Sequence, residues 1–439
     1  MTFERRAGWG WQALTLLFSV TVAAAQPLPS PLSERAAVEI ALARRNELAA
    51  AKHAIAVSAG AVTQAGLRQN PMFSVQTENW RFSGEPGFSA GRDLDFFAFM
   101  SQPIETGGKR NRRLELGRQG QATAEMGAKA LEFRIRQNVR RAYWNARAAD
   151  AKRRLLAENR DHFGRIVTFH QVRFENGAIA EADVIKVRLE RERLSAAAET
   201  AAMEAERAQI DLLAEMGWDD LMARTTLADP ASAAGLAMPA ARPELPPASE
   251  LVALAMQSRI EIALATRAIE RAKAQTELAR ANAKPNVTPY LGYKRTSSFN
   301  TLIGGVTVPL PFFDRNQGQI ASHLAEADQA EAELRAARAR VSAEVAAASA
   351  ALARRAGIVR SIESGMLDSA RETARIALAA YTEGGSDLFR LLDAERAQKE
   401  IELLHNETLF QWKLSEIDLD SAVGKDVAAQ SRGVHRAAN

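Results

Sequence analysis

The longest regular pattern in the sequence runs from Gly318 to Ala380, where apolar residues recur at alternating steps of three and four. A seven-residue repeat kept for about eight heptads is typical of a helix packed lengthwise against other helices. At about 1.5 Å per residue, some 60 residues make a rod of roughly 90 Å. Because an ordinary globular core needs no helix of that length, we expect the function to depend on the rod. The later part of the predicted seam includes Val341, Val345, Leu352, Val359, Ile362, Met366, Ser369, Thr373, Ile376 and Ala380.

Residues 1–25 have the features of a secretory signal peptide. Arg5 and Arg6 precede an apolar run over 13–22, and three alanines at 23–25 offer a cleavage site before Gln26. The run is too short to cross a bilayer core of about 30 Å as a helix, and no later stretch approaches about 18 uncharged apolar residues. We therefore expect an exported chain without a transmembrane helix; a retained N-terminal anchor is the alternative.

The composition excludes several classes of function. There is no cysteine, which rules out disulfides, thiolate metal ligands and a lipid-modified N-terminal cysteine. The 57 basic and 53 acidic residues are interspersed and no basic patch carries aromatic residues, so nucleic acid is not an expected partner. The six histidines show no dense ligand spacing, and we interpret His162 and His170 as surface residues. Without a catalytic, metal or cofactor motif, we do not expect an enzyme.

The exported chain consists of two similar halves. The matching positions are Asn70-Pro71 with Lys284-Pro285, Asn176-Gly177 with Glu383-Gly384, and Met216-Gly217 with Val423-Gly424. The last two pairs share an offset of 207 (384 − 177 and 424 − 217), whereas the first differs by 214 (285 − 71). A period near 200 indicates a duplicated domain. We expect a first repeat over 26–218, a Pro-rich linker over 219–248, a second repeat over 249–424 and a disordered tail over 425–439.

Each repeat is predicted to contain a helix, two strands, a long helix and a returning helix. In the first repeat these span about 33–68, 72–82, 93–102, 112–174 and 181–216. In the second they span about 249–283, 286–296, 301–308 and 318–380, with a last helix that ends near 423. The lengths place the strands at one end of the rod, the turns at Gly177 and Gly384 at the other, and the linker partway along it.

The strands are suited to a membrane. Apolar residues at 291, 293, 302, 306 and 308 alternate with polar or small ones, as in outer-membrane strands. Four strands cannot close a barrel, because the smallest closed membrane barrels have about eight. Since open sheet edges are not tolerated in lipid, chains would have to share a barrel, and three chains would supply 3 × 4 = 12 strands. Two soluble hairpins that cap a helical bundle are the alternative.

Two segments next to the strands resemble a known family. They are Ser-Gln-Pro-Ile-Glu-Thr-Gly-Gly-Lys-Arg at 101–110 and Val-Pro-Leu-Pro-Phe-Phe-Asp-Arg-Asn-Gln-Gly at 308–318. With the duplicated plan, they are similar to the TolC-type outer-membrane efflux proteins, in the branch that serves heavy-metal pumps of the resistance-nodulation-division class. Tyr381-x-x-Gly384 followed by Leu391-Leu392-Asp393-Ala394 resembles the periplasmic tip signature of that family.

This resemblance implies a mainly α fold with a small membrane β part. Three chains would form a homotrimer, with four strands per chain in one 12-stranded β-barrel in the outer-membrane lipid. Their long helical hairpins would form an α-barrel across the periplasm of a Gram-negative bacterium. The tip would meet a periplasmic adaptor protein and an inner-membrane pump.

The resemblance also implies which residues form the tip. The matching gate positions are Asp183, Tyr381, Ser386, Asp387, Arg390 and Asp393, and the turn positions are Gly177, Gly384 and Gly385. Arg390 stands where the family often has an acidic residue. Rings of Arg390 and Asp393 from three chains could pair and hold the tip shut; an ordinary helix-surface pair at i and i+3 is the alternative.

The sequence thus indicates the outer-membrane channel of a tripartite efflux pump, which conducts solutes passively and whose likeness is to heavy-metal systems. A duct for drugs, solvents or secreted polypeptide is one alternative. A periplasmic coiled-coil adaptor or structural protein without a pore is another.

Overall fold

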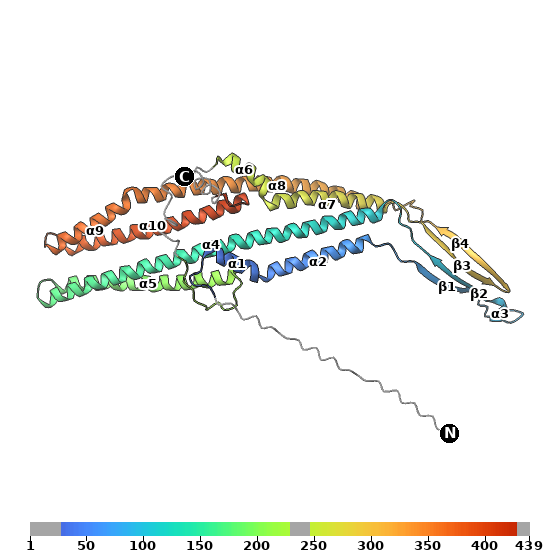
Figure 1. The fold of residues 1–439 in the computed structure, drawn as a ribbon, viewed down its shortest axis with the longest axis horizontal. Helices are drawn as coiled ribbons and strands as arrows, with labels where there is room; N and C mark the ends of the chain where they lie inside the picture. The colour runs from blue at the N-terminus through green and yellow to red at the C-terminus, as the bar shows by residue number, and fades with distance from the viewer. Residues whose placement is uncertain (1–27, 229–245, 428–439) are drawn as a thin grey trace, which may run out of the picture.

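The computed structural model describes residues 28–228 and 246–427 and shows an elongated array of helices that ends in a four-stranded sheet (Figure 1). The helical turns lie at one end of the rod and the sheet at the other, as predicted. The predicted mainly helical fold with few strands is confirmed. The predicted signal peptide, most of the Pro-rich linker and most of the C-terminal tail lie outside the described residues.

The first repeat contains five helices and two strands in the described part of the chain. They are α1 (Glu34–Arg44), α2 (Asn46–Gly66), β1 (Met72–Glu78), α3 (Ala90–Asp93), β2 (Asp95–Ser101), α4 (Lys109–Glu175) and α5 (Glu181–Glu215). Ser33 caps α1 as expected, because its hydroxyl accepts the Ala36 N–H at 3.2 Å. The first strand is four residues shorter than predicted (82 − 78), since Asn79 takes a left-handed conformation at φ 64° and ends it.

The second repeat follows the same plan. Its members are α6 (Ala248–Ser258), α7 (Ile260–Asn282), β3 (Thr288–Thr296), β4 (Phe299–Thr307), α8 (Gln317–Ser361), the π-helical turn η2 (Ile362–Met366), α9 (Leu367–Thr382) and α10 (Leu388–Val423). The end of α10 and the bounds of the two strands agree with the sequence prediction within two residues.

The first helix of each repeat is broken, where the sequence analysis predicts one continuous helix. The breaks fall at Arg45 and at Arg259, and both residues have extended backbone. Arg45 Nη1 donates to the carbonyl of Glu215 at 3.1 Å, at the end of α5. Arg259 Nη1 donates to the carbonyl of Ala422 at 3.0 Å, at the end of α10. Each arginine therefore satisfies carbonyls that a helix end leaves without intrahelical partners.

A glycine beside each arginine allows this close approach. Gly217 and Gly424 have φ 66° and 79°, and a Cβ on either would lie 3.3 Å from the Cδ of the neighbouring arginine. The duplication therefore repeats a specific tertiary contact as well as a helical pattern. The sequence analysis did not identify these two arginines. They lie 214 positions apart (259 − 45), the same offset as between Pro71 and Pro285.

The predicted 318–380 helix is interrupted, and its predicted seam is wrong beyond Ile362. In the structure Ala374 and Tyr381 are buried, whereas Met366 is 43% exposed and Thr373 is exposed. The turn η2 accounts for the shift, because a π turn takes one more residue than an α turn. Gly365 lies in this turn with non-helical backbone angles (φ 172°, ψ −27°). The inserted residue moves the buried row by one position along α9.

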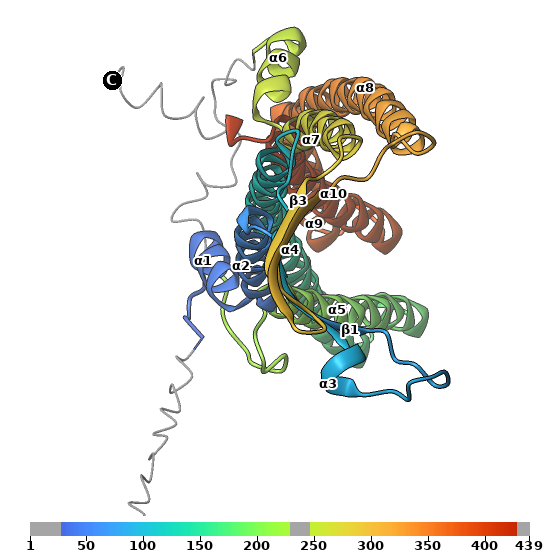
Figure 2. The ribbon, with the colours of Figure 1, turned by 90° about the vertical axis from the view of Figure 1, so that its right-hand side faces the viewer.

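The helices form one curved layer with α4 near its middle. On one side α4 contacts α2 and α5, which follow each other along the rod; on the other it contacts α7 and α10. The helices α8 and α9 pack on the far side of α7 and α10 (Figures 1 and 2). The two lateral edges of the layer are therefore α2 with α5 and α8 with α9. At the first of these edges, α2 has no buried residue at all.

The strands form an antiparallel sheet in the order β1-β2-β3-β4, which appears as a curved ribbon when viewed from its end of the rod (Figure 2). Pairing places side chains on two faces. One face, here called the apolar face, carries Phe73, Val75, Met100, Leu291, Tyr293, Leu302 and Val306. The other, the polar face, carries Ser74, Gln76, Asp95, Ser101, Lys294, Thr301 and Thr307 together with Phe97, Phe99 and Tyr290.

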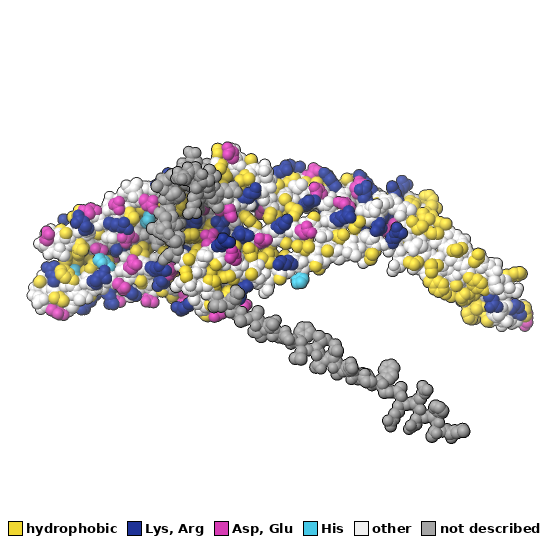
Figure 3. All heavy atoms as spheres, in the orientation of Figure 1, with side chains coloured by type: hydrophobic (Ala, Val, Ile, Leu, Met, Phe, Trp, Pro, Cys, Tyr) yellow, Lys and Arg dark blue, Asp and Glu magenta, His cyan; other side chains and the backbone are white. Residues whose placement is uncertain are grey.

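The apolar face is exposed to an unusual degree. Leu302 is 82% exposed and Phe73 is 68% exposed. Figure 3 shows hydrophobic side chains gathered on the strand end, with charged ones collected on the helices and at the far tip of the sheet. A contiguous exposed apolar surface marks a membrane or protein interface. None of the described helices is long and apolar enough to cross a membrane.

Candidate functional site at the helical tip

The tip consists of two helical hairpins, α4 with α5 and α9 with α10. Gly177 and Gly384 turn the chain with φ 72° and 79°, the left-handed region in which a side chain is strained. Gly385 closes the second turn by donating its N–H to the Ala380 carbonyl at 2.8 Å. The three glycines predicted as turn residues therefore lie in the two turns.

The predicted gate residues lie at the tip, on the first turn of α5, the end of α9 and the start of α10. Asp387 is the N-cap of α10, and its carboxylate accepts the Arg390 N–H at 2.9 Å. Ser386 precedes it and is half-buried. Arg390 and Asp393 are exposed on α10, and in this described segment their side chains form no ion pair, so the simple surface pair is absent. Asp183 lies in the first turn of α5, 3.7 Å from Lys186 Nζ.

Tyr381 contacts a histidine of the other hairpin. Its hydroxyl lies 2.8 Å from His170 Nε2, and the two rings stack with centroids 5.3 Å apart and an interplanar angle of 16°. Both side chains are buried, His170 at 1% exposure. His170 Nδ1 lies 2.8 Å from the Ile166 carbonyl, which can only accept, so Nδ1 carries the proton. In the tautomer with its proton on Nδ1, Nε2 accepts the Tyr381 O–H, and this bond joins α4 to α9.

The surroundings of the phenol keep it neutral. Burial raises the pKa of Tyr381, the nearby Arg173 guanidinium lowers it, and the Asp183 carboxylate raises it. Arg173 also lies over the Tyr381 ring at 5.5 Å. Asp183, which was predicted to be a tip residue, thus acts on Tyr381 through its charge.

Two further polar contacts join the hairpins. His162 Nε2 of α4 lies 3.2 Å from Glu395 Oε2 of α10; neither atom makes a hydrogen bond, so the two form an ion pair only when the imidazole is protonated. Arg396 of α10 pairs with Glu190 of α5, and this hydrogen bond raises the pKa of Arg396. Glu190 and Glu395 are only 3% and 4% exposed. Their partners are less buried, since the side chains of His162 and Arg396 are 32% and 44% exposed, and Glu190 also pairs with Arg193 of its own helix at 3.0 Å.

The sequence analysis missed most of these residues, and its interpretation of His170 as a surface residue is wrong. Leu156, Phe163 and His170 follow one another at intervals of seven, so His170 continues the buried row of α4. Glu190 likewise lies in the row of Val187 and Leu194 on α5. For His170 and Glu190, the position of a polar residue within an otherwise apolar row was the sequence feature that could have predicted burial.

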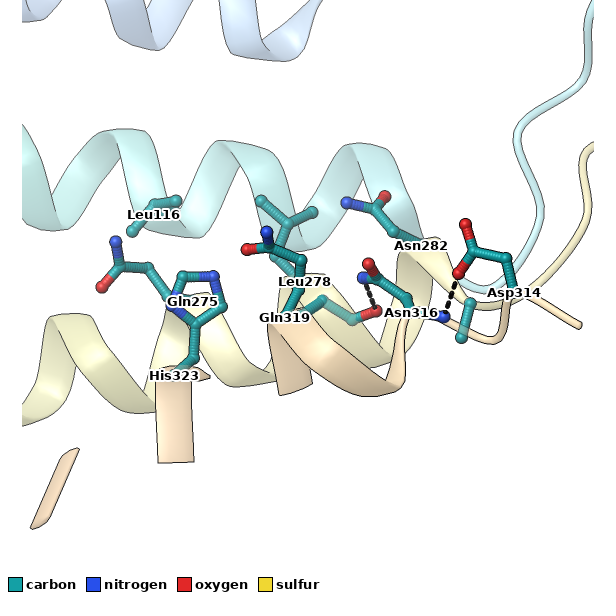
Figure 4. A pocket seen from close by; sticks show the side chains of 10 residues that line it. Leu116, Gln275, Leu278, Asn282, Asp314, Asn316, Gln319 and His323 are labelled. Carbon is teal, nitrogen blue, oxygen red and sulfur yellow. Dashed lines mark hydrogen bonds between the residues drawn. The ribbon is translucent and has the colours of Figure 1, made fainter. Parts of the chain in front are cut away.

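A polar pocket of about 390 Å³ lies at the other end of the helices, between α4, α7 and the start of α8 (Figure 4). Asn316 shapes it: its side chain donates to the Ala279 carbonyl at 2.8 Å, and its N–H donates to Asp314 Oδ1 at 2.8 Å. His323 and Asp314 both line the pocket. Within residues 28–228 and 246–427, no three His, Asp or Glu side chains gather as metal ligands.

The chain is similar to known proteins over most of its length. The model of the outer membrane efflux protein family matches residues 37–217 and 251–425. The cobalt-zinc-cadmium resistance protein CzcC of Cupriavidus metallidurans is 25% identical over 399 residues, which cover 90% of each chain. A solved structure of CusC matches with a TM-score of 0.73 at 18% identity, over 89% of this chain and 92% of that one. The outer membrane protein VceC of Vibrio cholerae matches with a TM-score of 0.70 at 18% identity, over 89% and 96%.

Replacing Tyr381 with phenylalanine should loosen the tip. The change leaves His170 Nε2 buried without a donor, which costs about 1–3 kcal/mol. We expect faster amide hydrogen exchange in α9 and in the facing part of α4, and none of this in Phe389→Leu, a control at a 72% exposed position of the same tip. Unchanged exchange in Tyr381→Phe would show that the bond does not hold the hairpins together.

The same bond predicts a pH dependence. Because burial raises the pKa of Tyr381 above its usual value of 10.0, the phenol can still donate this hydrogen bond near pH 10 and loses it only as the pH rises through the higher folded-state pKa. Exchange in α9 should therefore accelerate, beyond its intrinsic base catalysis, at strongly alkaline pH in the wild type but not in Tyr381→Phe.

Proposed function

The chain belongs to the outer membrane efflux protein family, and we propose that three copies of it close into one duct that leads from the periplasm through the outer membrane. Each copy would contribute four strands to a 12-stranded β-barrel and its curved helical layer to an α-barrel. The duct conducts solutes without chemistry, and a partner pump in the inner membrane supplies the energy.

The observation that carries this proposal is that the sheet and the helical layer both end in unpartnered edges. The sheet has β1 at one edge and β4 at the other. The helical layer has α2 with α5 at one edge and α8 with α9 at the other. The first repeat supplies one edge of the sheet and one edge of the helical layer, and the second repeat supplies the other two. A single rotation from one copy to the next would therefore join β1 to β4 and α2 with α5 to α8 with α9. A cyclic arrangement of identical copies closes such heterologous edges.

The physics of the bilayer supports closure. Unpaired backbone N–H and C=O groups are not tolerated in the hydrocarbon region, so β1 and β4 require partners there. A barrel puts apolar side chains toward lipid and polar ones toward the lumen. The apolar face, with Leu302 and Val306 more than half exposed, would contact lipid, and the polar face would line the duct. A soluble adaptor gives no reason for so large an exposed apolar face.

We further propose that the tip is the periplasmic gate and the docking end for the adaptor protein. Arg390 and Asp393 are exposed and unpaired with each other within one chain, so they are free to meet equivalent residues of neighbouring copies. Tyr381, with Asp183 beside it, and Ser386 and Asp387 at the start of α10 would set the position of that helix. The buried links between the hairpins would then resist the separation that opens the tip.

The cargo proposal is heavy-metal cations. Its support is the relative CzcC, whose name describes resistance to cobalt, zinc and cadmium. The pump would be of the resistance-nodulation-division class. A duct must release its cargo, and the absence of a three-ligand cluster in the described residues is compatible with that requirement.

Cysteine pairs should test the closed barrel directly, because the natural chain has no thiol. We expect Ser74→Cys on β1, combined in turn with Thr301→Cys, Ile303→Cys or Thr307→Cys on β4, to give disulfide-linked trimers at one or two neighbouring positions. Ser74→Cys with Lys294→Cys on the central strand β3 is the control and should give none. If no pair yields linked trimers, the β1 and β4 edges do not meet.

Conductance should test the gate. Purified protein in planar bilayers should give small channels, and Arg390→Gln combined with Asp393→Asn should enlarge them several-fold by removing the charged rings. Glu407→Gln, an exposed change farther along α10, is the control and should leave conductance unchanged. Complete lack of conductance in every variant would contradict the duct; equal conductance in all would contradict the gate assignment.

A susceptibility panel should identify the cargo. A strain without this gene is expected to become more sensitive to one or more of cobalt, zinc, cadmium, nickel, copper and silver, and complementation should restore resistance. Sensitivity confined to organic antibiotics would keep the duct and exclude metal as its cargo.

A further inference from the structure

An aromatic side chain lies flat against the polar face of the sheet. Tyr290 of β3 and Gly305 of β4 are direct cross-strand partners. A Cβ on Gly305 would lie 2.5 Å from Tyr290 Oη and 2.7 Å from its Cζ. The ring therefore extends across β4 and occupies the space that a side chain at 305 would fill. Phe99 of β2 flanks it, with ring centroids 5.7 Å apart.

A second glycine on the same face differs in what opposes it. A Cβ on Gly292 would meet backbone atoms, including Phe99 Cα at 2.5 Å. Backbone cannot move aside, so Gly292 is required by the strand packing. At Gly305 the obstacle is the far end of a flexible side chain, which can turn away. A residue larger than glycine at 305 is therefore compatible with the sheet, provided that the Tyr290 ring leaves its place.

A Tyr290 ring that leaves the wall would turn into the lumen of the proposed duct. This step rests on the proposed function, in which the polar face lines a 12-stranded barrel. With strands about 4.8 Å apart and tilted by about 40°, such a barrel is roughly 24 Å across between backbones. Packed sheets lie about 10 Å apart, so inward side chains extend about 5 Å from each wall. The clear opening along the barrel axis is then roughly 14 Å wide. Three tyrosine rings raised from the wall would narrow this opening strongly.

We propose that Tyr290 sets the clear width of the barrel and that Gly305 provides the recess that holds its ring against the wall. The pair makes the exit wide enough for hydrated ions and small complexes to leave freely. Substituting Gly305 turns the three rings into the lumen at one level, close to the helical end of the sheet. The size of solute that passes this level is then decided by the side chain at 290.

The test measures barrel width independently of the tip. Thr307 lies on the polar face one layer nearer to the helices than Gly305, and Thr301 lies on the same face toward the far end; both are exposed. In the otherwise cysteine-free chain, Thr307→Cys is labelled on intact cells with membrane-impermeant maleimide–polyethylene glycols of increasing size. A reagent that reaches residue 307 from outside must pass the level of Tyr290.

We expect Gly305→Val to slow the labelling of Thr307→Cys by the larger reagents at least 10-fold, with labelling of Thr301→Cys unchanged. Adding Tyr290→Ala to Gly305→Val should restore the rate. Gly304→Val is the matched control, because the neighbouring Gly304 lies on the apolar face, and it should not change labelling of either position.

The outcomes separate this inference from the proposed function. If Gly305→Val leaves labelling at 307 unchanged, or if Tyr290→Ala does not restore it, Tyr290 does not set the width. If Thr301→Cys resists even the smallest reagent in the wild type, the polar face does not line a duct open to the exterior, and the proposed function itself fails.

Discussion

The unpaired edges of the sheet are the constraint on which the architecture depends. Strands β1 and β4 each present a row of backbone groups that water could satisfy but lipid could not. The apolar face is unfavourable in water, because residues such as Leu302 are largely exposed in one copy of the chain. In the proposed duct, further copies of the chain would supply the partners that both strands lack. The layer of helices likewise has two edges without a neighbouring helix, α2 with α5 on one side and α8 with α9 on the other.

One extra residue in a helix decides how the two repeats meet at the tip. The π turn η2 rotates α9 so that Tyr381, and not Ala380, faces the core. In that position the phenol reaches His170 on the other hairpin. A continuous α-helix would direct Tyr381 away from this contact. The π turn thus converts a helical surface position into a tertiary contact between repeats.

The tip is held by polar contacts at positions that elsewhere in the rod are apolar. His170, Glu190 and Glu395 are nearly fully buried; His170 and Glu190 form hydrogen bonds to Tyr381 and Arg396 of the other hairpin, and Glu395 lies next to His162. Apolar packing is nondirectional and tolerates sliding, whereas a buried hydrogen bond or ion pair is satisfied in one geometry and costly when broken. If the tip is the gate that we propose, such contacts would hold one arrangement of the hairpins and release it as a unit.

The sequence by itself determined the duplication, the helical rods, the strand positions and the location of the tip turns, because periodicity and Gly or Pro signals are local properties of the chain. It did not reveal the breaks at Arg45 and Arg259, since an arginine ends a helix only where a neighbouring helix end offers it carbonyls. Nor did it reveal the π turn, because Met366, Ile376 and Ala380 continue the unshifted apolar row beyond Ile362 and so hide the one-residue shift. The partners of His170 and of Tyr290 were decided by tertiary structure alone, because they come from segments 211 and 15 residues away, and only packing brings them into contact.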